Sequence, residues 1–229
     1  MILKQYTNSY RYNSDTIFLY NFISKYSLKG EILDVGSGCG VLGLLLKRDF
    51  SSVELSQIEI QDKYAKLSQK NANINNLKSN IIKDDFLLHS FDKKFDFIVS
   101  NPPFYHSGSL KSEDNSLYLS RHSNALKFDK FAKKVYSILK PKGSFLFCYD
   151  AKQVDLLLQA LLASKFKVNE IQFIHVDTKK PASLVMIWAK RESKSLCKIL
   201  PPLILYENHK YKKDILDIFK KADTNSEDI

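Results

Sequence analysis

Four consecutive residues, Asn101-Pro102-Pro103-Phe104, combine a polar amide, two rigid prolines and an aromatic ring. Proline fixes φ and lacks an N–H, so the pair holds the Asn101 amide and the neighbouring carbonyls in one geometry. The oxygen atoms of this segment can accept hydrogen bonds from an amino group, and the ring can stack on a planar substrate. Asn-Pro also begins many ordinary turns, so a simple strand-ending turn is the alternative for this segment alone.

A second segment, Asp34-Val35-Gly36-Ser37-Gly38-Cys39-Gly40, is rich in glycine. Gly36, Gly38 and Gly40 allow a ligand to approach the backbone closely, and the helix expected after them offers free N–H groups. The spacing differs from the dinucleotide fingerprint G-x-G-x-x-G. The carboxylate of Asp34 would repel a pyrophosphate but would attract a cationic ligand that carries an amino acid tail. The segment therefore favours S-adenosylmethionine over NAD as the cofactor.

Two further acids lie at the ends of expected strands. Glu59 lies about 20 residues beyond the glycine segment, where an acid can accept hydrogen bonds from both ribose hydroxyls of a nucleoside. Asp85 lies at the end of the next expected strand and could accept the adenine amino group, while Phe86 packs near the ring. The alternatives are a solvated surface acid for Glu59 and an ordinary turn acid for Asp85.

The elements that must position these residues alternate between strand and helix. Apolar or alternating runs predict seven strands, at 31–35, 53–60, 80–86, 95–100, 144–149, 165–176 and 183–190. Helical patterns separate most of them, and the last two strands form a hairpin. We therefore predict an α/β fold with a Rossmann-like, doubly wound, seven-stranded sheet that is mostly parallel and has an antiparallel edge strand. The acids and Asn101 would then meet at the carboxyl ends of the strands.

The chain of 229 residues is long enough for one core, and we expect a single domain over residues 1–221. Within it, residues 1–30 form an N-terminal flap and helix, 105–127 a substrate-facing loop and 196–221 a C-terminal extension. Residues 222–229 are expected to be a frayed, disordered tail.

Composition limits the partners and the compartment. The net charge of +10 suits RNA or DNA, although lysine-rich codon usage would give the same value. No apolar run approaches the ~18 residues of a membrane span, and the N-terminus has no signal-peptide pattern. The three cysteines are far apart in sequence, which favours a reducing, cytoplasmic compartment and gives no reason to expect a metal site. The oligomeric state is left open.

Several polar or basic residues are candidates for substrate contacts, with surface loops and local salt bridges as the alternative. They are Tyr10, Arg11, Tyr105, Arg121, His122, Lys179 and Lys180.

The chain resembles the class I S-adenosylmethionine-dependent methyltransferases, in particular the Asn-Pro-Pro-aromatic group that methylates amino nitrogens. It is most similar to the bacterial tRNA (adenine-N6)-methyltransferase family that acts on adenine 37 of a valine tRNA. The resemblance covers nearly the whole chain. It rests on Tyr10-Arg11-Tyr12, Asp15, Asp34–Gly40, Glu59, Asp85, Asn101–Phe104, Arg121, Lys180-Pro181-Ala182, Pro201-Pro202-Leu203 and Tyr206.

This resemblance implies methyl transfer to the N6 amine of a tRNA adenine without a metal. Asn101 and the Pro102 carbonyl would accept the N–H groups of the amine, and Phe104 would stack on the flipped base. Family members more often carry Tyr at the position of Phe104, and Asn-Pro-Pro-Phe also occurs in rRNA guanine-N2 methyltransferases. The sequence is also compatible with a protein glutamine-N5 methyltransferase of the same fold and with a catalytically silent RNA-binding protein.

Overall fold

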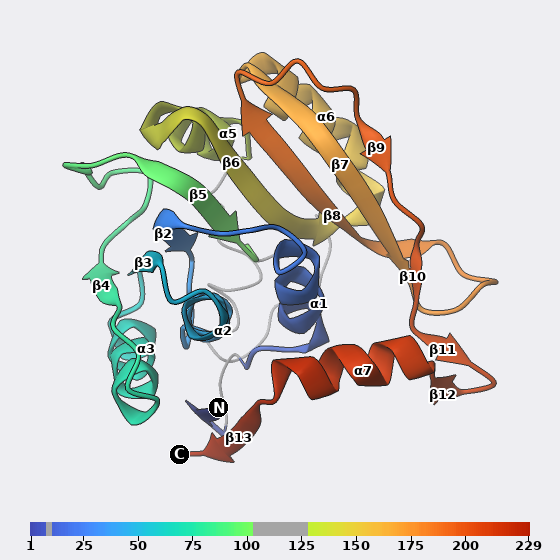
Figure 1. The fold of residues 1–229 in the computed structure, drawn as a ribbon, viewed down its shortest axis with the longest axis horizontal. Coiled ribbons are helices and arrows are strands. Elements are labelled where there is room, and N and C mark those ends of the chain that lie inside the picture. Colours follow the sequence, from blue (N-terminus) through green and yellow to red (C-terminus); the bar gives the residue numbers. More distant parts are fainter. Residues whose placement is uncertain (8–10, 103–127) are drawn as a thin grey trace.

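The computed structural model describes residues 1–7, 11–102 and 128–229 (Figure 1). Over these residues its main sheet has nine strands, seven of which correspond to the predicted ones. These seven are β2 (Gly30–Val35), β3 (Val53–Glu59), β4 (Asn80–Lys83), β5 (Phe95–Ser100), β6 (Leu139–Asp150), β7 (Phe166–His175) and β8 (Ala182–Arg191). Two short strands of the C-terminal extension, β9 (Lys198–Ile199) and β10 (Leu203–Ile204), also pair with β7. The order across the sheet is β10-β7-β8-β6-β5-β2-β3-β4.

The sheet is mostly parallel, as predicted, but its antiparallel strand is not at the edge. Strand β8 runs antiparallel to both β6 and β7 and lies between them. The connection from β6 to β7 through α6 (Val154–Ala163) does not place β7 directly beside β6. It leaves one strand position open between them. The hairpin then returns β8 into the position left open, where it can pair on both sides.

Helices cover both faces of the sheet, which makes the fold doubly wound (Figure 1). One face carries α1 (Ser14–Ile23), α2 (Val41–Asp49), α3 (Asp62–Ile74) and α7 (Lys213–Ala222). The other carries α5 (Phe128–Ile138) and α6. Successive strand residues point to opposite faces, so Ile32 packs in the first core and Leu33 in the second. None of the helices in the described ranges is long and apolar enough to span a membrane.

The two ends of the chain meet in a small separate sheet. Strand β1 (Ile2–Gln5) pairs in parallel with β13 (Asn225–Asp228), and a second small sheet joins β11 (Tyr206–Glu207) to β12 (Lys210–Tyr211). The prediction of a frayed tail over 222–229 is therefore wrong. The polar side chains of β13 do not indicate a core strand. Its backbone nevertheless pairs with β1, and Lys4 forms an ion pair with Glu227.

Candidate functional site

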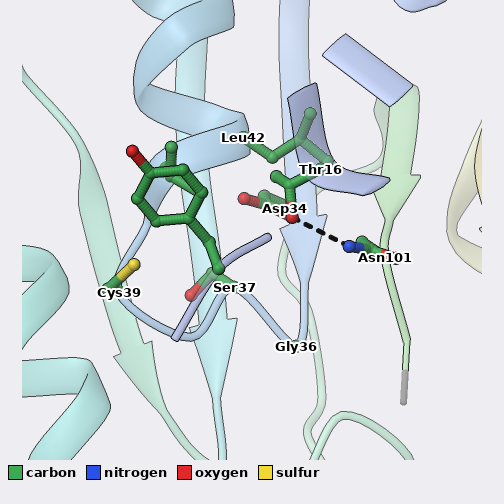
Figure 2. Close-up of a pocket in the computed structure, with 9 residues that line it drawn as sticks. Thr16, Asp34, Gly36, Ser37, Cys39, Leu42 and Asn101 are labelled. Carbon is green, nitrogen blue, oxygen red and sulfur yellow. Dashed lines mark hydrogen bonds between the residues drawn. The ribbon is translucent and has the colours of Figure 1, made fainter. Parts of the chain in front are cut away.

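The site forms where two neighbouring parallel strands end. Val35 of β2 and Ser100 of β5 are register partners, and the Ser100 hydroxyl donates to the Val35 carbonyl over 2.8 Å. Beyond this pair the chains diverge, β2 into the glycine segment and β5 into Asn101. The resulting pocket is shown in Figure 2, and its lining residues are Tyr12, Thr16, Asp34, Gly36, Ser37, Cys39, Val41, Leu42 and Asn101.

Asp34 supplies a carboxylate to the wall of this pocket. It is only 1% exposed, and its Oδ2 accepts hydrogen bonds from the Gly43 amide (2.9 Å) and from Gln57 Nε2 (3.3 Å). Burial raises the pKa of Asp34 to about 7, against the lowering effect of those two hydrogen bonds, and the charge of Glu59 raises it further. A positively charged ligand in the pocket would offset the cost of burying this anion.

Gln57 was not anticipated from the sequence, yet it links Asp34 to the glycine segment. It is fully buried and donates to Asp34 and, over 3.0 Å, to the Gly40 carbonyl. Its oxygen accepts from the hydroxyls of Ser68 and Ser79, each at 3.0 Å. The only sequence signal is a polar residue inside a strand that is otherwise suited to burial.

The glycine segment adopts the conformation that its composition predicts. Gly36 and Gly40 have φ of +67° and +86°, in the left-handed region that favours glycine. A Cβ at Gly36 would meet no atom within 4 Å, so this backbone borders open space. A Cβ at Gly40 would lie 2.4 Å from the Ser68 hydroxyl, so the absence of a side chain allows α2 to start close to α3.

Glu59 lies beneath the glycine segment rather than on the surface. It is 6% exposed; Oε2 accepts from the Gly38 amide and Oε1 from the Gln61 amide, both at 2.9 Å. Burial raises its pKa. The alternative of a solvated surface acid is therefore wrong. Glu59 is not among the residues that line the pocket in Figure 2, and its contact with a ribose stays a prediction.

Asn101 reaches the pocket from the end of β5 and points toward α1 (Figure 2). Its Nδ2 donates to the hydroxyl of Thr16 over 2.9 Å, and Thr16 is itself 3% exposed. With the amide nitrogen engaged, Oδ1 is the atom of this side chain that remains suited to accept a hydrogen bond from an incoming amine. Pro102, which follows, is buried.

Asp85 and Phe86 do not line this pocket. Asp85 follows β4 and its Oδ1 accepts from the Leu87 amide over 2.8 Å, as in the turn alternative. Phe86 is 5% exposed and packs edge-on against Phe131 of α5, with ring centroids 5.1 Å apart. The described contacts of Phe86 are therefore those of a core residue, because its ring faces the second core rather than the pocket.

The predicted substrate residues are only partly described. Arg11 forms an ion pair with Asp228 (2.5 Å). Lys179 and Lys180 are exposed on the hairpin after β7, where both backbone amides donate to Asp177 Oδ1. Because β7 is parallel to β5 and β2, this hairpin lies at the same edge of the sheet as the pocket. Tyr10, Phe104, Tyr105, Arg121 and His122 lie outside the described residues.

The pocket also contains residues that were not predicted to contact the cofactor or the substrate, notably Thr16, Ser37 and Cys39. Burial raises the pKa of the Cys39 thiol to about 12, so it is neutral and acts as a small apolar wall. Within 1–7, 11–102 and 128–229, no group of three or more His, Cys, Asp or Glu side chains is placed to hold a metal ion.

These residues fit S-adenosylmethionine. The buried carboxylate of Asp34 suits its positive charge, the open backbone at Gly36 suits close approach of a ligand, and both lie in one pocket with the amide of Asn101. From their position in this pocket, Asp34 and Gly36 are the residues that would contact the cofactor.

Comparison with known proteins finds methyltransferases. The family model of the methyltransferase small domain matches residues 11–171. The chain is similar to two proteins named tRNA1(Val) (adenine(37)-N6)-methyltransferase. It is 32% identical to the one from Bacteroides thetaiotaomicron, over 65% of this chain and 63% of that protein. It is 30% identical to the one from Pedobacter heparinus, over 75% and 73%.

Solved structures share the fold. A predicted O-methyltransferase from Agrobacterium tumefaciens superposes with a TM-score of 0.71 at 17% identity, covering 94% of this chain and all of that one. A 16S rRNA N2 G1207 methyltransferase from T. thermophilus, solved with S-adenosylmethionine and guanosine, gives 0.57 at 22% identity, over 81% of this chain and 45% of that one. The chain thus belongs to the methyltransferase small domain family and is an S-adenosylmethionine-dependent methyltransferase.

Proposed function

We propose that this enzyme methylates the exocyclic N6 amine of an adenine in tRNA, at position 37 of a valine tRNA. The observation that carries the proposal is the placement of Asn101. Its amide nitrogen is held by Thr16, so the oxygen is the group offered to an amine at the mouth of the cofactor pocket. The names of the relatives from B. thetaiotaomicron and P. heparinus supply the base and the tRNA.

S-adenosylmethionine supplies a methyl group that is already activated by a positively charged sulfur. The protein therefore needs mainly to hold the acceptor nitrogen in line with it. An exocyclic base amine is a poor nucleophile because its lone pair is conjugated with the ring. Asn101 Oδ1 and the Pro102 carbonyl would accept its two N–H groups, which directs the lone pair toward the methyl group and stabilises the positive charge that develops on nitrogen.

The base itself would be held by stacking. Phe104 follows the two prolines directly, and an aromatic ring contributes about 1–3 kcal/mol per stacked base. The net charge of +10 favours an RNA partner, and Arg11, Lys179 and Lys180 are proposed contacts together with Tyr10, Tyr105, Arg121 and His122. A tRNA substrate would place the enzyme in the cytoplasm.

The test is methyl transfer with labelled cofactor to three separate substrates: unmodified tRNA, ribosomal RNA and a protein fraction. Digestion to nucleosides and mass spectrometry identify the product. We expect label in N6-methyladenosine from tRNA alone. Label in N2-methylguanosine from ribosomal RNA, or in protein glutamine, would replace the proposal with the corresponding activity, and no label in any fraction would contradict it.

A further inference from the structure

The side chain of Tyr12 connects the cofactor pocket to the C-terminus of the chain. Tyr12 lines the pocket. Its hydroxyl lies 2.9 Å from the hydroxyl of Ser226 and donates to that of Thr224 over 3.2 Å. Both partners come from the last six residues, more than 200 positions away in sequence.

The C-terminal segment that holds Tyr12 is itself well anchored. Strand β13 pairs along its length with β1, Gln5 Nε2 donates to the Ser226 hydroxyl over 2.8 Å, and the Ile229 amide donates to the Gln5 carbonyl over 2.8 Å. Gln5 also accepts from the backbone amide of Tyr12 at 3.1 Å, so the two ends of the chain hold both the backbone and the side chain of this tyrosine. Arg11, the preceding residue, pairs with Asp228.

The small terminal sheet is tied to the glycine segment as well. The side chain of Asn71, which is fully buried on α3, accepts from the Lys4 amide over 2.8 Å and donates to the Lys4 carbonyl over 3.1 Å. The same amide nitrogen donates to the Cys39 carbonyl over 2.9 Å. Strand β1 is therefore fixed relative to one wall of the pocket, and β13 fixes Tyr12 at another.

We propose that β13 is a working part of the cofactor site: it positions Tyr12 against the pocket, and thereby sets the affinity for S-adenosylmethionine. Tyr12 is a binding residue in this assignment, and Thr224 and Ser226 are positioning residues that act through it. The proposal rests on the methyltransferase site and does not depend on which base is methylated. The physical basis is preorganisation, because an aromatic wall that is already held costs less conformational entropy to order when the ligand binds.

The test is isothermal titration calorimetry with S-adenosylmethionine and no RNA, in which variants are compared with the wild type. Tyr12→Phe removes the hydroxyl but keeps the ring. Thr224→Val with Ser226→Ala removes both partners without touching the pocket, and deletion of residues 224–229 removes the strand. Tyr211→Phe is the matched control, because it removes a tyrosine hydroxyl from β12, outside the pocket lining.

We expect the dissociation constant to rise roughly 3- to 10-fold in the first two proteins, as for the loss of one or two hydrogen bonds, and to stay unchanged in the control. The deletion should raise it at least as much, because it also removes the pairing of β13 with β1. Because the strand acts through Tyr12, adding Tyr12→Phe to the Thr224→Val, Ser226→Ala protein should cause no further loss. Unchanged affinity in the Thr224→Val, Ser226→Ala protein would overturn the proposal. Fully additive effects of Tyr12→Phe and of these two substitutions would also overturn it. Neither result would bear on the proposed tRNA substrate, which this experiment does not contain.

Discussion

Asp34 meets two opposing demands at the scale of a single residue. Its burial makes the ionised form costly, while a cationic cofactor needs that form. The Gly43 amide and Gln57 hold one carboxylate oxygen without neutralising the group, and the pKa of Asp34 is about 7. The side chain is thus close to its titration midpoint at neutral pH, and a bound cation would draw it toward the ionised form.

We expect Asp34→Asn to remove a pH-dependent loss of stability. The ordinary pKa of Asp is near 4. Between about pH 4 and about pH 7 the folded protein therefore retains a proton that the unfolded chain has released, and the contribution of Asp34 to stability falls as the pH rises. Urea unfolding should show the free energy of unfolding of the wild type falling relative to Asp34→Asn across this window. A constant difference would contradict the assignment.

Cofactor affinity, measured by calorimetry, should fall roughly tenfold or more in the Asp34→Asn variant, as for the loss of a charged partner.

Thr16 offers a second prediction at this scale, since it orients the amide of Asn101. Thr16→Val has the same shape but no hydroxyl, and Thr16→Ser keeps the hydroxyl. We expect the valine variant to lose roughly tenfold in kcat, with the KM for cofactor much less affected, because the Asn101 amide is free to rotate. The serine variant should stay close to wild type. Equal kcat values for the two variants would show that the hydroxyl does not position the amide.

At the scale of elements, the turn between β2 and α2 decides the shape of the pocket. Gly36 and Gly40 both have positive φ, but only Gly40 is crowded, by Ser68. The same substitution at the two sites therefore separates backbone strain from packing.

Alanine at either glycine should cost about 1 kcal/mol of stability from the left-handed backbone. Gly40→Ala should lose clearly more, because its methyl group would press on the Ser68 hydroxyl. Gly36→Ala should lose less stability but more cofactor affinity, because its methyl group would enter the pocket. Urea unfolding and calorimetry measure the two effects. Similar stability losses at both sites would contradict this packing.

The alternation of strands and helices and the glycine turn were predictable, because each depends on local pattern and backbone chemistry. The position of β8 was not, since a hairpin requires β7 and β8 to be neighbours but does not determine on which side β8 lies. The role of β13 was not predictable either: its residues are polar, and its partner β1 is at the other end of the chain. The contacts of Phe86 could not be predicted, because an aromatic residue beside an acid gives no indication of the face to which its ring points.

At the scale of the whole molecule, the net positive charge and the hairpin after β7 are the features from which we predict RNA binding. Lys179 and Lys180 lie at the edge of the sheet that carries the pocket, whereas Lys29 and Lys78 lie before β2 and β4, at the opposite edge. All four are exposed.

Replacing Lys179 and Lys180 with alanine should weaken tRNA binding and reduce the slope of log K against log salt concentration by about 1–2. Replacing Lys29 and Lys78 removes the same charge and should leave the slope nearly unchanged. Filter binding over a range of salt concentrations measures both. Equal effects from the two pairs would mean that RNA binding depends on the total charge and not on the lysines at this edge of the sheet.

The central claim is that Asn101 binds and orients the amine that receives the methyl group. It is tested most directly by the single-turnover rate of N6-methyladenosine formation in unmodified valine tRNA, compared between wild type and Asn101→Ala, with cofactor affinity measured on the same preparations. We predict a rate reduced by roughly 100-fold or more, as for the loss of a transition-state hydrogen-bond partner, with cofactor affinity within about threefold of wild type. A variant that still methylates adenine at close to the wild-type rate would contradict the account.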